Sequence, residues 1–148
     1  EKVLAIYPAN NDTEMLDSSK RLLGDSLFGA PSYYAARAMA DRGEDIYFYH
    51  FNQKPAGKAG EILGAFHASE IAYVFGVGGL GPIEDPELSR IMLQYWTNFS
   101  QTGNPNGETI PDWEIMKSEQ DTWHLLGPKI GPENISRMNI YNLLRRIS

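Results

Sequence analysis

The sequence predicts an α/β fold with a mostly parallel sheet flanked by helices. Residues 46–51 form an aromatic, apolar run without polar alternation, which is typical of a strand covered on both faces. Residues 31–43 and 86–103 carry apolar side chains at helical spacing on either side of this run. Strands and helices therefore alternate along the chain, as they do in an α/β layer.

The first 43 residues predict a short apolar run and two helices. The apolar run spans residues 2–7. A short helix over residues 17–23 should stop at Gly24, because glycine commonly ends helices. Pro31 then stands at a favourable first position of the next helix, and Gly43 provides the end of that helix.

His67 follows the predicted strand after a loop that contains several glycines. Residues 54–64 include one proline and three glycines and predict this loop. Residues 69–75 can make a short helical turn, and the glycine-rich residues 76–82 predict a second loop. An α/β sheet presents functional side chains at the carboxyl ends of its strands, so His67 lies where such a fold places a site.

The remainder of the chain predicts two helices and one strand. The clearest helix has Asp85 as its amino-terminal cap, a broad apolar face, and Gly103 at its end. Residues 122–126 suggest a short strand, and residues 127–132 suggest a turn. A last helix is expected over about residues 136–147, where apolar residues again recur at helical spacing.

Composition excludes several classes of protein. With 148 residues, of which 42% are hydrophobic, the chain has the material for the core of one ordinary domain. The net charge of −6 comes from scattered acidic residues, so no basic stripe predicts a nucleic-acid partner. No apolar run approaches the roughly 18 residues of a membrane span. There is no cysteine, which excludes disulfides and thiolate metal sites.

Two segments carry a family resemblance. Residues 64–76 read Gly-Ala-Phe-His-Ala-Ser-Glu-Ile-Ala-Tyr-Val-Phe-Gly, and residues 95–107 read Tyr-Trp-Thr-Asn-Phe-Ser-Gln-Thr-Gly-Asn-Pro-Asn-Gly. With these segments the chain resembles the carboxyl-terminal part of the type-B carboxylesterases, the family that includes the cholinesterases. The resemblance implies that residues 1–148 are the carboxyl-terminal segment of a single α/β-hydrolase domain.

In that family a histidine placed like His67 is the general base of a catalytic triad, so the resemblance implies a serine carboxylesterase. Such a reaction needs a serine hydroxyl, an imidazole that takes its proton, and a carboxylate that orients the imidazole. The serine of an α/β-hydrolase lies in a Gly-x-Ser-x-Gly turn and precedes the acid and the histidine. No such turn occurs in this sequence. We therefore expect the amino-terminal part with the nucleophile to be missing, which fits a chain that begins at Glu1 rather than methionine, and we expect this segment alone to be inactive.

The resemblance also implies the partners of the site. The substrate is expected to be a small-molecule carboxylic ester, and the protein partner is expected to be the missing amino-terminal part of the same protein. No cofactor and no metal are implied. The identity of the ester and the compartment, cytoplasmic or secreted, stay open, although the lack of cysteine is more typical of bacterial or intracellular relatives.

Several residues near the motif have a functional and a structural interpretation. Glu70 matches a family glutamate held in a polar network near the site, and it could instead cap the following turn. Ala68 replaces a glycine that the family often has after the histidine. His50 and His124 are interpreted as structural. The motif around residues 95–106 is interpreted as scaffold, because its glycine, asparagine and proline suit the end of a helix.

Two other functions compete with the esterase. Some relatives, such as the neuroligins, keep the fold without the triad and act as adhesion or binding modules. Retention of His67 argues against such a role. The second alternative is a self-contained small binding domain that folds on its own, whereas a segment of a larger sheet should expose strand edges and apolar helix faces.

Overall fold

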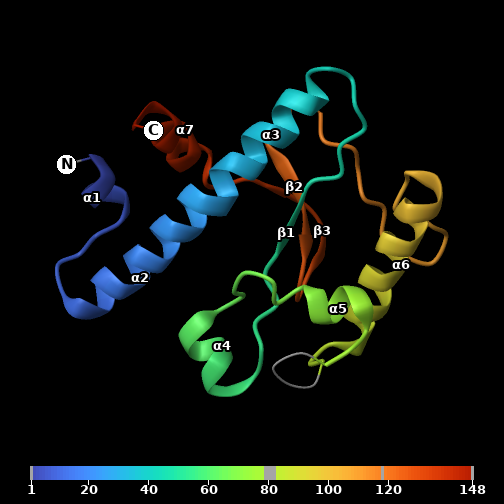
Figure 1. The fold of residues 1–148 in the computed structure, drawn as a ribbon, viewed down its shortest axis with the longest axis horizontal. Coiled ribbons are helices and arrows are strands. Elements are labelled where there is room, and N and C mark those ends of the chain that lie inside the picture. Colours follow the sequence, from blue (N-terminus) through green and yellow to red (C-terminus); the bar gives the residue numbers. More distant parts are fainter. Residues whose placement is uncertain (1, 79–82, 118, 148) are drawn as a thin grey trace. The chain divides into compact units, whose positions relative to one another are not determined.

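The computed structural model describes residues 2–78, 83–117 and 119–147. The chain divides into two compact units, which are described separately. The first unit holds helices α1 (Lys2–Ile6), α2 (Asp12–Gly24), the π-helix η1 (Asp25–Gly29), α3 (Ala30–Ala40) and α7 (Met138–Ile147) (Figure 1). The second unit holds β1 (Tyr49–Phe51), α4 (Gly57–Leu63), α5 (Ile71–Phe75), α6 (Pro86–Thr102), β2 (Thr122–Leu126) and β3 (Ile130–Asn134).

The described sheet is mixed. Its strand order is β1-β2-β3, with β1 parallel to β2 and β2 antiparallel to β3. Tyr49 pairs with His124 and Phe51 with Leu126, so β1 and β2 end at the same edge of the sheet. The α/β character is thus present, but the mostly parallel sheet expected from the sequence is not confirmed by these three strands.

The aromatic run at residues 46–51 forms a shorter strand than expected, and it is not covered on both faces. Only Tyr49–Phe51 is strand, and its middle residue, His50, is exposed. The His50 ring stacks on Trp123 of β2, with centroids 4.2 Å apart. In the described sheet β1 pairs on one side, with β2. Its other two side chains contact helices: Tyr49 packs on Trp96 of α6, and Phe51 packs on Tyr73 of α5.

Glycine and proline misled the prediction at two places, and the structure assigns an element to the apolar run at residues 2–7. The expected loop at residues 54–64 contains α4, in which the backbone of Gly60 approaches Pro55 so closely that a side chain would collide with it. The expected turn at residues 127–132 is shorter, because β3 begins at Ile130. The apolar run at residues 2–7 is the helix α1. Glycine here serves close approach and tight turning as well as helix termination.

The helix that was expected to stop at Gly24 instead continues to Ala40. It begins at Asp12, ahead of the expected start at residue 17, and the Asn11 side chain caps it by accepting the Glu14 N–H at 3.0 Å. Gly24 has α-helical backbone angles, so the chain passes directly into η1 and α3. The predicted stop is wrong because packing of this helix within the first unit outweighs the modest penalty of one internal glycine.

Pro31 explains why a π-helix interrupts this long helix. Proline has no N–H to donate, and in an α-helix its ring clashes with the carbonyl four residues earlier. The turn before it is widened, and the Ala30 N–H donates to the Asp25 carbonyl five residues back. Pro31 thus lies near the start of α3, as the sequence predicted, but within a continuous helix.

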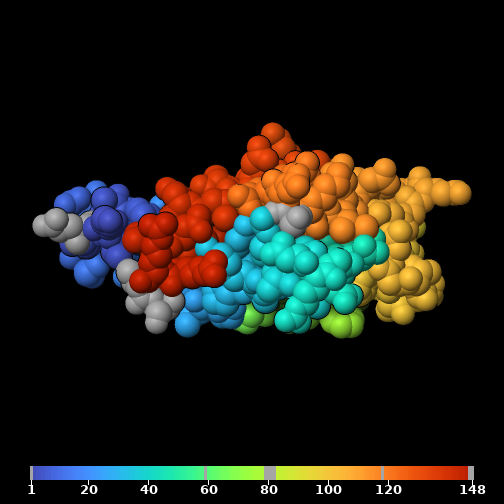
Figure 2. Space-filling view, turned by 90° about the horizontal axis from the view of Figure 1, so that it is seen from above, coloured from blue at the N-terminus to red at the C-terminus, as the bar shows by residue number. Residues whose placement is uncertain are grey.

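The π-helix carries the buried charge of the first unit. The Asp25 side chain is only 4% exposed, and it accepts hydrogen bonds from the Tyr7 hydroxyl at 2.9 Å and from the Arg137 guanidinium. Gly29, at the end of the same π-helix, faces the Tyr141 ring of α7, where an added Cβ would lie 2.6 Å from the hydroxyl oxygen. The red residues of α7 lie beside the light-blue residues of α3 in the space-filling view (Figure 2).

We expect Arg137→Met to destabilise the protein, because it leaves the buried Asp25 carboxylate without its cation. Breaking a buried ion pair from one side costs roughly 3–5 kcal/mol, and the lower end applies because Arg137 is partly exposed. The measurement is the free energy of unfolding in urea. Arg90→Met, which removes an exposed pair with Glu87, should change it little. Equal effects of the two substitutions would contradict this role of Arg137.

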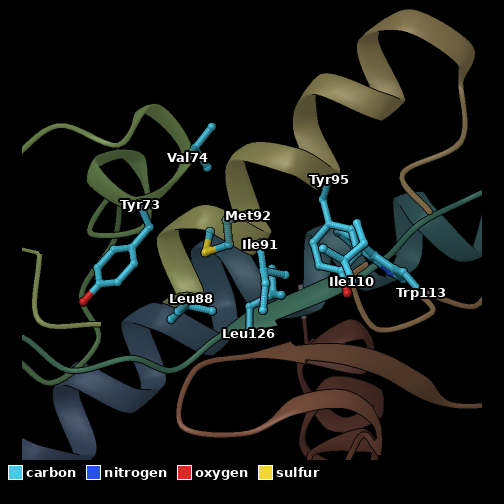
Figure 3. Packing of buried hydrophobic residues seen from close by; sticks show 9 residues of the cluster. All are labelled: Tyr73, Val74, Leu88, Ile91, Met92, Tyr95, Ile110, Trp113 and Leu126. Atoms are coloured by element: carbon cyan, nitrogen blue, oxygen red, sulfur yellow. The ribbon is translucent and has the colours of Figure 1, made fainter. Parts of the chain in front are cut away.

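The second unit has its core along the apolar face of α6. The helix begins and ends as predicted, with the Asp85 side chain accepting the Leu88 N–H at 2.9 Å and with Gly103 in the left-handed conformation at φ 76°. Met92 and Tyr95 are fully buried. Figure 3 shows the core residues gathered between α5, α6 and the sheet: Tyr73, Val74, Leu88, Ile91, Met92, Tyr95, Ile110, Trp113 and Leu126.

Candidate functional site

His67 lies in a tight turn between α4 and α5. The Ser69 N–H donates to the Phe66 carbonyl at 3.0 Å, and the Ser69 hydroxyl donates to the same oxygen at 2.6 Å. These two hydrogen bonds close a four-residue turn in which His67 is the second residue. The His67 side chain is exposed. The turn therefore holds the histidine at its tip while its own polar groups are satisfied locally.

Ala68, the third residue of this turn, has an unusual backbone conformation. Its φ is 70°, and within the described residues it is the one non-glycine residue with a positive φ. A turn with positive φ at the third residue and not at the second is of type II, which favours glycine or asparagine at that position. The positive φ at this position gives a physical reason why the family that this chain resembles often has a glycine after its histidine.

The turn is attached to the core through α5. Tyr73 and Val74 of α5 are buried, and the Ser89 hydroxyl of α6 donates to the Tyr73 carbonyl at 2.9 Å. The Tyr73 ring also contacts Phe51, the last residue of β1, with centroids 5.4 Å apart. Helix α5 thus lies beyond the carboxyl end of β1 (Figure 1). The turn that contains His67 directly precedes α5, and a functional role of His67 at this edge of the sheet stays a prediction.

The structure does not show Glu70 as a side-chain cap, and it removes one argument for a link between Glu70 and His67. Because Ala68 is left-handed, residues 67–70 are not helical, and the argument that three-residue spacing puts His67 and Glu70 on one helix face does not apply. Glu70 precedes α5 in the cap position, but its side chain makes no capping hydrogen bond. Burial, and second the charge of Glu70, raise the pKa of Tyr49. A role of Glu70 in tuning His67 stays a prediction.

His124 is a structural histidine in the core of the second unit. It is 3% exposed, and its ring stacks on Trp113 with centroids 5.0 Å apart. The Tyr95 hydroxyl donates to the Pro111 carbonyl at 2.6 Å, so we assign the 3.2 Å contact between this hydroxyl and His124 Nε2 to an N–H donated by the imidazole. Burial lowers the pKa of His124 to about 4. His50, stacked on Trp123, likewise fits a structural role.

We expect His124 to make the protein acid-sensitive. The lowered pKa of His124 means that the folded state holds the ring neutral while the unfolded chain binds a proton below about pH 6.5. Neutral His124 therefore contributes fully to the free energy of unfolding above that pH. As the pH falls toward 4, this contribution is lost, which lowers the free energy of unfolding by on the order of 3 kcal/mol. The free energy of unfolding measured between pH 4 and 7 should fall less steeply in His124→Gln. Parallel curves for the two proteins would refute this assignment.

The segment after α6 is held by a network of side-chain amide hydrogen bonds. The Asn98 side chain donates to the carbonyls of Pro105 and Asn106, each at 3.1 Å. The Asn106 side chain binds both backbone groups of Trp113, accepting the N–H at 2.6 Å and donating to the carbonyl at 3.0 Å. These bonds hold the loop after α6 in place and position Trp113 in the core. The segment is therefore scaffold, as its sequence indicated.

The described residues offer no alternative chemistry of metal or membrane type. Residues 2–78, 83–117 and 119–147 contain no group of three or more His, Cys, Asp or Glu side chains arranged to hold a metal ion. Over the same ranges, no helix is long and apolar enough to cross a membrane.

Sequence reasoning found His67 but missed the conformation of its neighbour. Alanine has no preference for a left-handed backbone, so Ala68 gave no signal of the turn type. The sequence signalled a positive φ at residue 68 only indirectly, because the family that this chain resembles often has a glycine at this position. Ser69 gave a second indirect signal, because serine hydroxyls commonly bond to nearby backbone groups in turns.

The chain is similar in sequence to known carboxylesterases. The sequence model of the carboxylesterase family matches residues 1–140. A medium-chain fatty acyl-CoA hydrolase precursor from Anas platyrhynchos is 40% identical over 111 residues, which cover 71% of this chain and 20% of that protein. Carboxylesterase 5A from Felis catus is 40% identical over 127 residues, which cover 77% of this chain and 23% of that protein. Liver carboxylesterase from Sus scrofa is 38% identical over 106 residues, which cover 67% of this chain and 19% of that protein. The chain spans about a fifth of the length of these curated relatives.

Proposed function

Because the chain belongs to the carboxylesterase family, we propose that it is the carboxyl-terminal segment of a serine carboxylesterase and that His67 is the general base of that enzyme. Membership implies the α/β-hydrolase fold, and carboxylic ester hydrolysis is the activity named in several relatives. The observation that carries the proposal is the exposed His67, held by a closed turn beyond the carboxyl end of β1 in a chain of this family.

The proposed reaction follows from what an imidazole can do. His67 takes the proton from a serine hydroxyl as that oxygen attacks the ester carbonyl, and it returns the proton to the departing alcohol. It then takes a proton from water as the water attacks the acyl-serine, and it returns this proton to the serine as the carboxylic acid leaves. One imidazole thus serves both half-reactions. No step needs a metal or a cofactor.

The remaining triad members belong, in this proposal, to the part of the protein outside these 148 residues. The sequence has no Gly-x-Ser-x-Gly turn for the nucleophile. Glu70 is not proposed as the triad acid, because it follows the histidine in the chain, whereas the acid of this fold precedes it. The chain therefore supplies the base and requires the nucleophile and the acid from its partner segment.

Exposed apolar side chains are a second argument that the rest of the same polypeptide is the partner of this chain. Leu16, Leu23 and Leu27 are each more than half exposed in the first unit, and so is Phe75 in the second. Apolar surface of this extent commonly marks an interface. We propose that the rest of the same polypeptide covers these surfaces, which fits a chain that spans about a fifth of its relatives' length.

We expect His67→Ala in the full-length protein to lower kcat/KM for p-nitrophenyl esters by at least a thousandfold, because the serine then lacks its base. Residues 1–148 alone should be inert. The matched control is His50→Ala, an exposed histidine on β1 whose loss should change kcat/KM less than about threefold. Activity of His67→Ala within about tenfold of the wild type would contradict the assignment of His67 as the general base. A wild-type full-length protein that hydrolyses no ester would favour the binding module instead.

A further inference from the structure

We propose that Ala68 is a positioning residue for His67, because its left-handed backbone keeps the His67 turn in the type II form. The proposal rests on the proposed role of His67 as a base, and it adds the device that sets the direction of the imidazole. Its observations are the φ of 70° at Ala68 and the hydrogen bond from the Ser69 N–H to the Phe66 carbonyl that closes the turn.

The two common turn types differ in the conformation of their second residue, which here is His67. In a type II turn ψ of that residue is about +120° and φ of the next residue is about +80°, whereas in type I these angles are about −30° and −90°. The closing hydrogen bond is the same in both. A change of type therefore turns over the peptide between His67 and Ala68 and rotates ψ of His67 by about 150°. The type II form is possible only while residue 68 can be held at a positive φ, which alanine tolerates and a β-branched residue does not.

Alanine at this position carries a cost that the surrounding structure must offset. A left-handed conformation brings the Cβ of an L-residue other than glycine close to neighbouring backbone atoms and is therefore unfavourable. Such strain persists only where neighbouring contacts enforce it. Two contacts lie on the carboxyl side of Ala68: its carbonyl accepts the Ile71 N–H at 3.3 Å, and α5 is fastened to α6 by the Ser89 hydroxyl. The core thus enforces the type II turn at its carboxyl-terminal side.

Substitutions at residue 68 separate the choice of turn type from a simple change of size. Glycine and asparagine suit a positive φ, so Ala68→Gly and Ala68→Asn should keep the type II turn. Valine is branched at Cβ and strongly avoids a positive φ, so Ala68→Val should shift the turn toward type I. Ala65→Val is the matched control, because it adds the same atoms in the same loop at a residue without positive φ.

The test compares these variants in the full-length protein. We expect Ala68→Val to lower kcat for a p-nitrophenyl ester about a hundredfold with KM within about threefold, because a base displaced by about 1 Å loses that much. Ala68→Asn, Ala68→Gly and Ala65→Val should stay within about threefold of the wild type in both constants. An equal loss in Ala65→Val, or a full kcat in Ala68→Val, would overturn the proposal.

A crystal structure of Ala68→Val separates failure of this proposal from failure of the proposed function. It should show the peptide between His67 and Ala68 turned over, with the hydrogen bond from Ser69 to Phe66 kept. This result is expected even if the wild-type protein hydrolyses no ester, in which case the proposed function alone is wrong. An unchanged type II turn in this variant would show that residue 68 does not set the conformation of His67.

Discussion

The candidate site depends on the packing of the apolar face of α6 against α5 and the sheet. Met92 and Tyr95 are buried between α5 and the sheet, and the Ser89 hydroxyl fastens α5 through the Tyr73 carbonyl. The His67 turn directly precedes α5, so the packing of α5 on this core helps to hold the turn in place. Trp113 belongs to the same core, and the ring of His124 stacks on it.

Elements with a strong hydrophobic pattern and clear caps could be predicted from the sequence. Helix α6 has its cap at Asp85 and its end at Gly103 where the sequence indicated, and β2 spans the expected residues. The family resemblance pointed to His67, whose role stays a prediction. In each case the local signal and the packing of the folded chain favour the same structure.

Elements whose local signal conflicts with their packing could not be predicted. Gly24 lies inside a helix because tertiary contacts of that helix outweigh its weak propensity, and Pro31 is accommodated by a π-helical turn instead of a break. Gly60 lies within α4 because its backbone approaches Pro55. At the site, the conformation of Ala68 is set by the turn and by α5, and nothing in an alanine side chain announces it.

We propose that His67 activates a serine supplied by another part of the same protein, and the rate at which a fluorophosphonate labels the full-length protein tests this role. Mass spectrometry identifies the labelled residue. We expect stoichiometric labelling of one serine outside these 148 residues, and a rate at least a thousandfold lower in His67→Gln. Labelling at an undiminished rate in His67→Gln, or labelling of a serine within this chain, would contradict it.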